Sequence, residues 1–283
     1  MSRKKLAIAV PASVISDTPH LREKTSKIGL IGRAAAVFRV DEIIVYPDNA
    51  SRQKNEADLI ELLLSYLETP QYLRKRFYKL DPRLQYAGIL PPLRTPHHPL
   101  NRKIRKLKAG EYREGVTLSK TKEGVLVDIG VERPALMRET QWGLGKRLTL
   151  QVVAADERVE VQAVSRDTIP SYWGYKVRSE KQSFGNIVES GDFDLVIATS
   201  KLGASFVDVA ETMGEQWRKS GYTLVAFGAP ARGLHEIVGD EGLSLDDLAD
   251  FVVNMVPGQG TETVRTEEAL FASLAVLNVQ FGG

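Results

Sequence analysis

The chain alternates strand-like apolar runs with helix-like segments in two separate stretches, and a stretch without helical periodicity lies between them. The strand-like runs of the two alternating stretches cover residues 5–10, 41–46, 194–199, 223–228 and 251–256. Strands that alternate with amphipathic helices are typical of a mostly parallel sheet covered on both faces. The sequence therefore predicts one α/β domain whose two parts lie far apart along the chain.

The middle stretch predicts a small all-β unit inserted into this α/β domain. Prolines punctuate residues 81–100, which is the composition of a boundary. Strand-like pieces separated by turns follow at residues 112–120, 125–129, 133–138, 148–154 and 159–164. Short strands without an intervening helix favour a small barrel, for which an OB-like type is expected and an SH3-like type is the alternative. The predicted parts are residues 1–95, an inserted OB-like barrel at 96–170, and residues 171–283.

Composition limits the classes of site and the compartment. The chain has 283 residues, is 43% hydrophobic and has no cysteine, which excludes disulfides, thiolate metal sites and cysteine nucleophiles. No apolar run approaches the roughly 20 residues of a membrane span, and no secretory signal is recognisable. We therefore expect a cytoplasmic protein without a membrane partner. His97 and His98 have no third ligand at a recognisable spacing, so we expect no metal site and imidazoles that face solvent or phosphate.

The net charge is only +2, but basic residues gather in the middle of the chain. They are Arg74, Lys75, Arg76, Lys79, Arg83, Arg94, Arg102, Lys103, Arg105, Lys106 and Lys108. Such a cluster indicates a local contact with a polyanion, although basic loops can also serve solubility alone. Candidate faces for base stacking are Tyr112, Trp142, Tyr172, Trp173 and Tyr175, but buried aromatics are the commoner outcome.

A glycine loop follows the last strand-like run and precedes a helix predicted at residues 267–279. Gly258 and Gly260 have no Cβ, so a nucleoside-like ligand can lie against their backbone groups. Glu262, Arg265 and Glu268 follow with three-residue spacing, which predicts one face of the opening helical turns. The alternative interpretation of these three residues is a solvated helix face with ordinary ion pairs.

Polar or glycine loops end each of the late strand-like runs, at residues 199–201, 228–233 and 257–261. Loops at the carboxyl ends of parallel strands lie at the same edge of the sheet, where ligands bind. A dinucleotide-binding fingerprint is a weak match, because residues 258–263 end in threonine where it requires glycine. The sequence therefore predicts one pocket formed by these loops.

Several ordered segments carry a resemblance to a known family. Gly32-Arg33-Ala34-Ala35 with residues 38–45, then residues 224–233 and 254–269, resemble the three motifs of the trefoil-knotted SPOUT RNA methyltransferases. More narrowly, the chain resembles the archaeal and eukaryotic subfamily with an OB-like barrel inserted into the knotted domain. The resemblance implies a C-terminal trefoil knot, S-adenosylmethionine as cofactor, and a homodimer that binds RNA across both subunits.

The resemblance also implies roles for individual residues. The residues expected to contact S-adenosylmethionine are Thr199, Ser200, Gly228, Ala229, Pro230, Gly233, Val256, Pro257, Gly258, Gln259, Gly260, Thr261 and Val264. Three further residues are expected to be catalytic. Arg33 would steer the target phosphate or raise the acidity of the nucleotide, Arg265 would orient it, and Glu262 would interact with the donor or a proton. In-line methyl transfer depends on positioning and charge stabilisation and requires no metal.

Two departures from the ribose-methylating branch bear on the substrate. Ala229-Pro230 stands where that branch often has Asn-Glu, and Arg265 stands where it has asparagine. A base nitrogen, in particular that of a ribosomal RNA uridine, is therefore favoured over a ribose 2′-hydroxyl or a tRNA target. The alternatives from other classes are a non-catalytic RNA-binding or assembly protein and a nucleotide-dependent oxidoreductase.

Overall fold

The computed structural model describes residues 4–49, 53–156 and 158–282, and these fall into two compact units. Unit 1 takes in Met1–Ser65, Arg83–Pro92 and Tyr175–Gly283, and unit 2 takes in Tyr66–Pro82 and Leu93–Gly174. Each unit is thus formed by segments that are distant along the chain.

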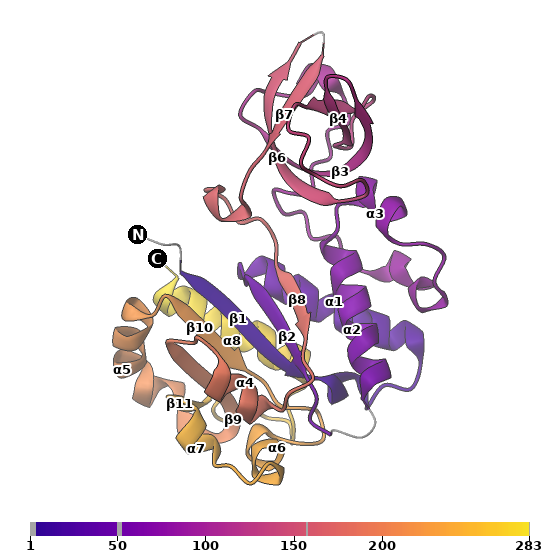
Figure 1. Ribbon diagram of the computed structural model, residues 1–283. Helices are drawn as coiled ribbons and strands as arrows, with labels where there is room; N and C mark the ends of the chain where they lie inside the picture. Colours follow the sequence, from indigo (N-terminus) through magenta and orange to yellow (C-terminus); the bar gives the residue numbers. More distant parts are fainter. Residues whose placement is uncertain (1–3, 50–52, 157, 283) are drawn as a thin grey trace. The chain divides into compact units, whose positions relative to one another are not determined.

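Unit 1 contains a six-stranded sheet in the order β11-β9-β10-β1-β2-β8 (Figure 1). The strands are β1 (Lys5–Pro11), β2 (Glu42–Tyr46), β8 (Lys176–Ser179), β9 (Leu195–Ser205), β10 (Tyr222–Ala226) and β11 (Phe251–Asn254). Every pairing is parallel, and Ile8 of β1 lies between Val225 and Ile43. The predicted α/β sheet made from both ends of the chain is confirmed.

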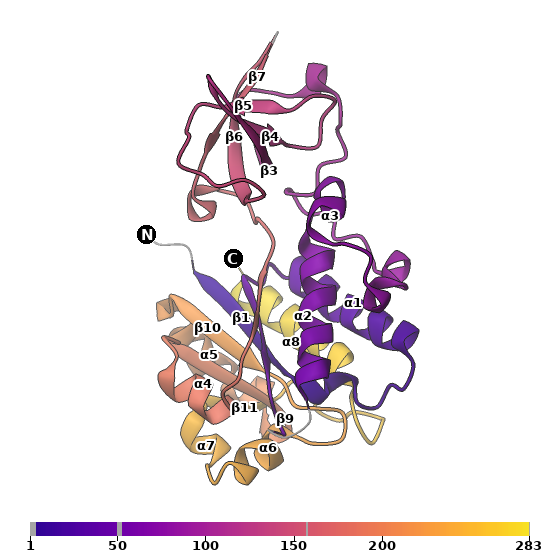
Figure 2. The same ribbon diagram turned by 45° about the vertical axis from the view of Figure 1, so that its right-hand side comes forward.

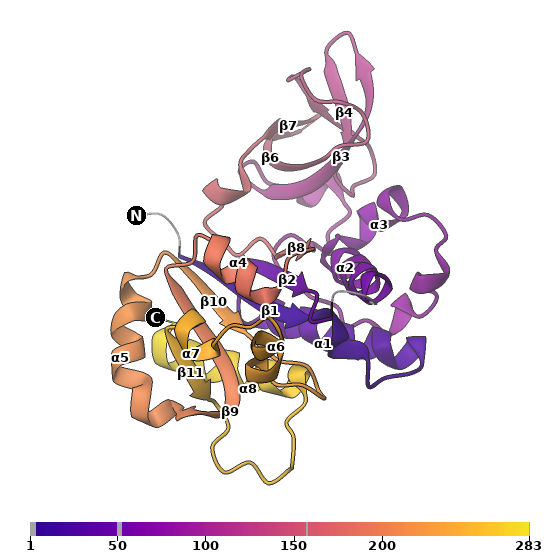
Figure 3. The same ribbon diagram turned by 60° about the horizontal axis from the view of Figure 1, so that its bottom comes forward.

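Helices cover both faces of this sheet. They are α1 (Leu21–Val37), α2 (Lys54–Glu68), α4 (Phe184–Ser190), α5 (Phe206–Lys219), α6 (Leu234–Asp240), α7 (Leu245–Leu248) and α8 (Thr266–Phe281), with the 3₁₀ turns η1 (Ala12–Ile15) and η3 (Ala87–Ile89). Residues of α4, α6 and α7 share one core with alternate residues of the sheet strands (Figure 3). On the opposite face α1 packs against α8 (Figure 1).

Unit 2 contains a closed five-stranded barrel in the order β3-β4-β5-β7-β6 (Figure 2). Its strands are β3 (Tyr112–Thr121), β4 (Gly124–Asp128), β5 (Ala135–Met137), β6 (Arg147–Ala155) and β7 (Val159–Ala163). The β5–β7 pairing is parallel and the others are antiparallel. The remaining elements numbered in this region are α3 (Gln71–Phe77), η2 (Pro82–Leu84), η4 (Ile104–Lys106) and η5 (Arg166–Thr168). A small barrel inserted into the α/β chain is therefore confirmed.

A buried polar cluster in unit 2 corrects the expectation for the two adjacent histidines. Glu68 contacts Arg147 at 2.7 Å, Arg166 at 3.2 Å and His97 at 3.2 Å. His97 is fully buried, and His98 Nε2 lies 2.7 Å from the Glu68 carbonyl oxygen. The prediction that these imidazoles face solvent or phosphate is wrong, because they pack around the end of α2 instead.

Three of the aromatic candidates for base stacking are buried. Tyr172 and Trp173 are buried in unit 2, and Tyr175 is buried in unit 1. The Trp173 indole Nε1 donates a hydrogen bond of 2.6 Å to Glu114. These three rings therefore stabilise the interior and present no open face for a base.

Two kinds of feature are absent from residues 4–49, 53–156 and 158–282. Among those residues, no helix has the length and apolar character needed to cross a membrane. In the same part of the chain, no group of three or more His, Cys, Asp or Glu side chains is arranged to hold a metal ion.

Candidate functional site

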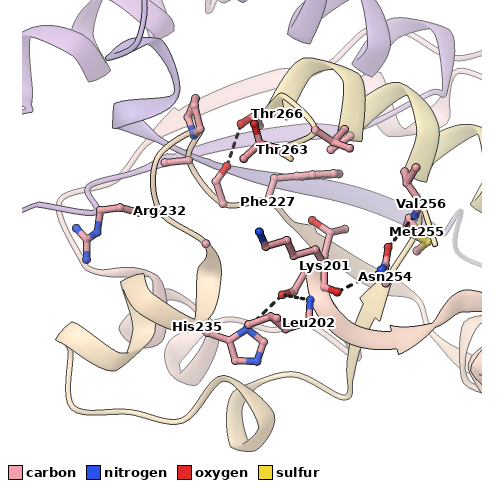
Figure 4. A pocket seen from close by; sticks show the side chains of 18 of the residues that line it. Lys201, Leu202, Phe227, Arg232, His235, Asn254, Met255, Val256, Thr263 and Thr266 are labelled. Carbon is pink, nitrogen blue, oxygen red and sulfur yellow. Dashed lines mark hydrogen bonds between the residues drawn. The ribbon is translucent and has the colours of Figure 1, made fainter. Parts of the chain in front are cut away.

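A cavity of about 400 Å³ lies in unit 1 beside the middle of β9 and the carboxyl ends of β10 and β11. It is lined by residues 199–202, 227–233, 235–236, 254–256, 259, 263–264, 266, 269 and 273. The three loops that the sequence predicted to converge thus all contribute to one cavity, and Figure 4 shows Lys201, Arg232 and Val256 around it. About half of the lining residues have polar or charged side chains, and the others are glycine or apolar.

The cavity includes part of the set expected to contact the cofactor. Lining residues from that set are Thr199, Ser200, Gly228, Ala229, Pro230, Gly233, Val256, Gln259 and Val264. Pro257, Gly258, Gly260 and Thr261 do not line it. Gly258 has φ of 72°, and nothing lies within 4 Å of where its Cβ would be. Glycine at this position suits the left-handed backbone of the turn.

The first lining segment is an excursion within β9, defined here as residues 199–203. Val252 of β11 pairs with Ala198, but the next residue of β11 pairs with Ala204, so the residues between leave the ladder. The prediction that the strand ends at Thr199 and that a loop follows is wrong, because β9 continues to Ser205. A Cβ on Gly203 would lie 2.5 Å from the Val252 carbonyl oxygen, which explains glycine at the point of return.

Side chains hold the β9 excursion in place. The Asn254 amide Nδ2 donates to the Lys201 carbonyl oxygen at 3.2 Å, and its Oδ1 accepts from Val256 N at 3.0 Å. Ser200 Oγ accepts from Leu202 N at 3.2 Å and lies 3.2 Å from His235 Nδ1 (Figure 4). The excursion is therefore tied to both neighbouring segments of the cavity.

The second lining segment, residues 227–233, is a tight turn fixed by Arg232. The Ala229 N–H donates to the Arg232 carbonyl oxygen at 2.9 Å. The Arg232 guanidinium donates to the Asp48 carbonyl oxygen at 3.2 Å and to Glu236 at 3.0 Å, and it also contacts Asp240. These charged hydrogen bonds use the guanidinium to hold the turn.

The third lining segment, defined here as residues 254–273, is joined to the second through Thr266. The Thr266 hydroxyl donates to the Gly228 carbonyl oxygen at 3.0 Å, and Thr266 is buried. One residue further on, Glu267 lies 3.6 Å from the buried Lys27 ammonium, which also contacts Asp17 at 2.8 Å. The start of α8 is thereby held against α1 and against the second segment.

The three residues expected to be catalytic do not line the cavity. The start of α8 at Thr266 places Glu262 before the helix and Arg265 at its N-cap, so the expected common helical face is wrong. Arg265 has an extended backbone, and its N–H donates to Glu268 at 2.9 Å. Arg33 lies on α1, where its guanidinium donates to the Pro92 carbonyl oxygen at 3.1 Å.

Sequence reasoning missed several lining residues that organise the cavity. Lys201 and His235 line it, and so does Thr266, yet none of them was in the set expected to bind the cofactor. Thr266 stands directly after the N-cap, so a correct helix start would have pointed to it. Lys201 belongs to the loop at residues 199–201 that was expected to form part of the pocket, although no role was assigned to it, whereas His235 carries no local signal.

The chain is similar in sequence to several known proteins. The family described as "Putative RNA methyltransferase" matches residues 5–277. An uncharacterized protein of Halobacterium salinarum is 34% identical, with 96% of this chain and 98% of that protein covered. A 28S rRNA (uridine-N(3))-methyltransferase of Drosophila melanogaster is 34% identical over 96% of this chain, which spans 61% of that protein. The Mus musculus protein of the same name is 33% identical, with 96% and 75% covered.

The family match spans both the strands that form the cavity and the strands that form the barrel. It therefore covers the whole arrangement described above rather than one common motif. The chain belongs to the family described as "Putative RNA methyltransferase".

Proposed function

We propose that the protein transfers a methyl group from S-adenosylmethionine to the N3 atom of a uridine in ribosomal RNA. The observation that carries the proposal is the cavity that the three predicted loops form together in a chain of this family. The names of the Drosophila and mouse relatives support uridine N3 of ribosomal RNA as the target.

The cavity suits an adenosine-containing methyl donor. Its volume of about 400 Å³ lies within the roughly 300–1,000 Å³ that is usual for small-molecule sites. Phe227, Val256 and Val264 supply apolar contact surface, and the backbone of the second and third segments supplies hydrogen-bonding groups. Adenine requires this combination of a flat apolar slot and directed polar groups.

Bound in this cavity, S-adenosylmethionine supplies an electrophilic methyl group on a positively charged sulfur. The residues of the chain must orient the uracil ring and accept the proton of N3, since the protonated imide is a poor nucleophile. Glu262 and Arg265 flank Thr263 and Val264, which line the cavity. We assign Glu262 the role of proton acceptor and Arg265 that of orienting the nucleotide. Arg33 stabilises negative charge on the target nucleotide.

The barrel of unit 2 is assigned to RNA binding. The basic side chains of residues 102, 103, 105, 106 and 108 are exposed. Exposed lysine and arginine side chains can neutralise phosphates of a folded RNA without recognising its sequence. The expected boundaries near residues 95 and 170 stay a prediction.

We further infer a SPOUT-type trefoil knot and a homodimer. Both rest on the resemblance of residues 32–45, 224–233 and 254–269 to the motifs of that class. The homodimer is also supported by exposed apolar side chains on the two packed helices, Leu30 and Val37 on α1 and Val279 on α8. Light scattering of the purified protein tests the dimer, and a monomeric mass would contradict it.

The enzymatic proposal is tested by supplying the protein with methyl-labelled S-adenosylmethionine and separate transcripts of large-subunit rRNA, small-subunit rRNA and tRNA. We expect N3-methyluridine in ribosomal RNA when the nucleosides are separated by mass spectrometry. A 2′-O-methylated nucleoside, or label in tRNA alone, would replace the proposed target with one of the alternatives. RNA binding without calorimetric binding of the donor would identify a non-catalytic RNA-binding protein.

A further inference from the structure

The charges around the cavity are unevenly satisfied. Two lining residues, Lys201 and Arg232, have a cationic lysine or arginine side chain. The Arg232 guanidinium is engaged by Glu236, Asp240 and the Asp48 carbonyl oxygen. The Lys201 ammonium makes no hydrogen bond or ion pair with any residue that the structure describes. Figure 4 shows this ammonium pointing into the cavity.

The backbone of Lys201 is fixed even though its ammonium has no partner. Its carbonyl oxygen accepts from Asn254, and both of its neighbours line the cavity with it. Ser200 contacts His235 and the Leu202 amide, so the peptide groups on either side are also held. The β9 excursion thus presents one lysine side chain to the cavity from a rigid base.

The chemistry of the methyl donor selects the partner of this lysine. S-adenosylmethionine carries a sulfonium and an ammonium, which Lys201 repels, and one carboxylate, which it attracts. Glu236, an acidic residue of the lining, is already paired with Arg232. Lys201 is exposed, so a charge-assisted hydrogen bond to the carboxylate replaces water around its ammonium and draws the amino-acid arm toward the β9 excursion.

We propose that Lys201 binds the α-carboxylate of the amino-acid arm of the methyl donor and thereby sets the orientation of the sulfonium. This assignment rests on the proposed function, since it concerns the donor bound in the same cavity. It makes Lys201 a specificity determinant: ligands with the carboxylate gain from the lysine, and adenosine derivatives without it do not.

Two nucleosides separate this contact from the rest of the site. S-adenosylhomocysteine carries the carboxylate, whereas 5′-methylthioadenosine lacks the whole amino-acid end. In calorimetry, we expect Lys201→Met to weaken the binding of S-adenosylhomocysteine by about 10- to 100-fold, which is the loss expected for a hydrogen bond to a charged group. The affinity for 5′-methylthioadenosine stays within about twofold, because the adenosine contacts are intact. Lys201→Arg keeps the charge and restores most of the affinity.

The matched control is Lys219→Met, which removes an exposed lysine of α5 that does not line the cavity. Lys219→Met should bind both nucleosides as the unchanged protein does, and the thermal unfolding of all variants should coincide. Equal weakening of both nucleosides by Lys201→Met would overturn the assignment. So would unchanged S-adenosylhomocysteine affinity together with a raised KM for RNA, which would place Lys201 on an RNA phosphate.

The two proposals fail in different ways. If the unchanged protein binds neither nucleoside, the donor proposal is overturned and the Lys201 assignment with it. If the unchanged protein binds S-adenosylhomocysteine and Lys201→Met binds it equally well, only the Lys201 assignment is overturned.

Discussion

Thr266 joins two segments of the cavity with one hydroxyl. Its Oγ1 donates to the Gly228 carbonyl oxygen at 3.0 Å, and the residue is buried. Removing one partner of a buried hydrogen bond leaves the other unsatisfied, at a cost of about 1–3 kcal/mol. The position of the second segment relative to α8 depends on this contact.

Thr266→Val should therefore loosen the donor site while it keeps the shape of the side chain. We expect S-adenosylhomocysteine to bind about 5- to 10-fold more weakly in calorimetry, because Gly228 loses its donor. Thr266→Ser retains the hydroxyl and serves as the control, with affinity close to that of the unchanged protein. Equal affinities for the valine and serine variants would show that this hydrogen bond does not shape the site.

Arg33 calls for a different readout, because it lies on α1 and does not line the cavity. Arg33→Ala should lower kcat for RNA methylation by about 100-fold or more and leave donor affinity within about twofold, as expected when charge stabilisation in the transition state is lost. Arg22→Ala, an exposed arginine on the same helix, is the control and should keep full activity. Full methylation by Arg33→Ala would end its catalytic assignment.

At the scale of elements, the β9 excursion can be tested through its glycine. A Cβ at Gly203 meets the backbone of Val252 and Val253 at 2.5–2.6 Å, and backbone cannot move aside as a side chain can. Gly203→Ala should lower the melting temperature of unit 1 and weaken donor binding, since the return of β9 to the ladder is disturbed. Gly239→Ala on α6 is the matched control, because nothing lies within 4 Å of its Cβ.

The control should change stability in the opposite direction. Alanine replaces glycine within a helix, which stabilises by up to about 1 kcal/mol. Thermal unfolding followed by circular dichroism distinguishes the two variants. A Gly203→Ala protein as stable as Gly239→Ala would mean that the close approach at Val252 is relaxed without cost.

Sequence patterns predicted the buried strands well and the exposed polar segments poorly. The central strands and the barrel strands were predicted because burial imposes apolar runs or alternation. β8 was missed: it is an edge strand, and Lys176 and Arg178 are exposed. The continuation of β9 through Lys201 and Gly203 was missed because no apolar run marks it: residues 199–203 leave the ladder, and side chains of distant segments hold them. The helix predicted from residue 267 begins one residue earlier in α8, but Glu262 and Arg265 were wrongly placed in its opening turns on the strength of their spacing alone.

At the scale of the whole molecule, the buried cluster around Glu68 makes stability depend on pH. Burial alone would raise the pKa of Glu68, but the charge of Arg147, the hydrogen bond from His97 and the charge of Arg166 lower it to about 2. Burial lowers the pKa of His98 to about 3, so its imidazole stays neutral in the folded protein. The lowered pKa of Glu68 stabilises the folded state at neutral pH, and the lowered pKa of His98 disfavours the folded state as the pH falls.

The sign of the pH dependence follows for each group. Unfolded His98 takes up a proton below its ordinary pKa of 6.5, and the folded form does so only near pH 3, so stability falls across that window. Glu68 adds a second loss between its ordinary pKa of 4.5 and about 2. We therefore expect the urea midpoint of unit 2, followed by fluorescence of the buried Trp173, to fall as the pH is lowered from 7 to 4. A flat profile would contradict this expectation.

Glu68→Gln isolates the contribution of the carboxylate. The charges of Arg147 and Arg166 lose a buried partner, so the free energy of unfolding at pH 7 should drop by about 3 kcal/mol or more. Glu160→Gln removes the carboxylate from an exposed pair with Arg138 and should change stability by less than about 1 kcal/mol. Equal effects of the two substitutions would show that the Glu68 cluster does not stabilise unit 2.

Contacts between segments that are distant along the chain set the limit on what the sequence could predict about the site. The convergence of the three loops follows from parallel strands, so the cavity could be expected before it was seen. The contact of Lys27 with Glu267, or of Thr266 with Gly228, depends on packing between segments that are far apart along the chain. Local patterns carry no information about such pairs.

The place of β1 in the sheet has a consequence for how the protein is made. This apolar strand lies between β2 and β10, and Lys5 pairs with Tyr222. During translation the nascent strand keeps one edge open until more than two hundred further residues have left the ribosome. The cavity can be completed only later still, because Ser273 of α8 belongs to its lining. A polypeptide cut short before Ser273 therefore lacks part of the lining of the cavity.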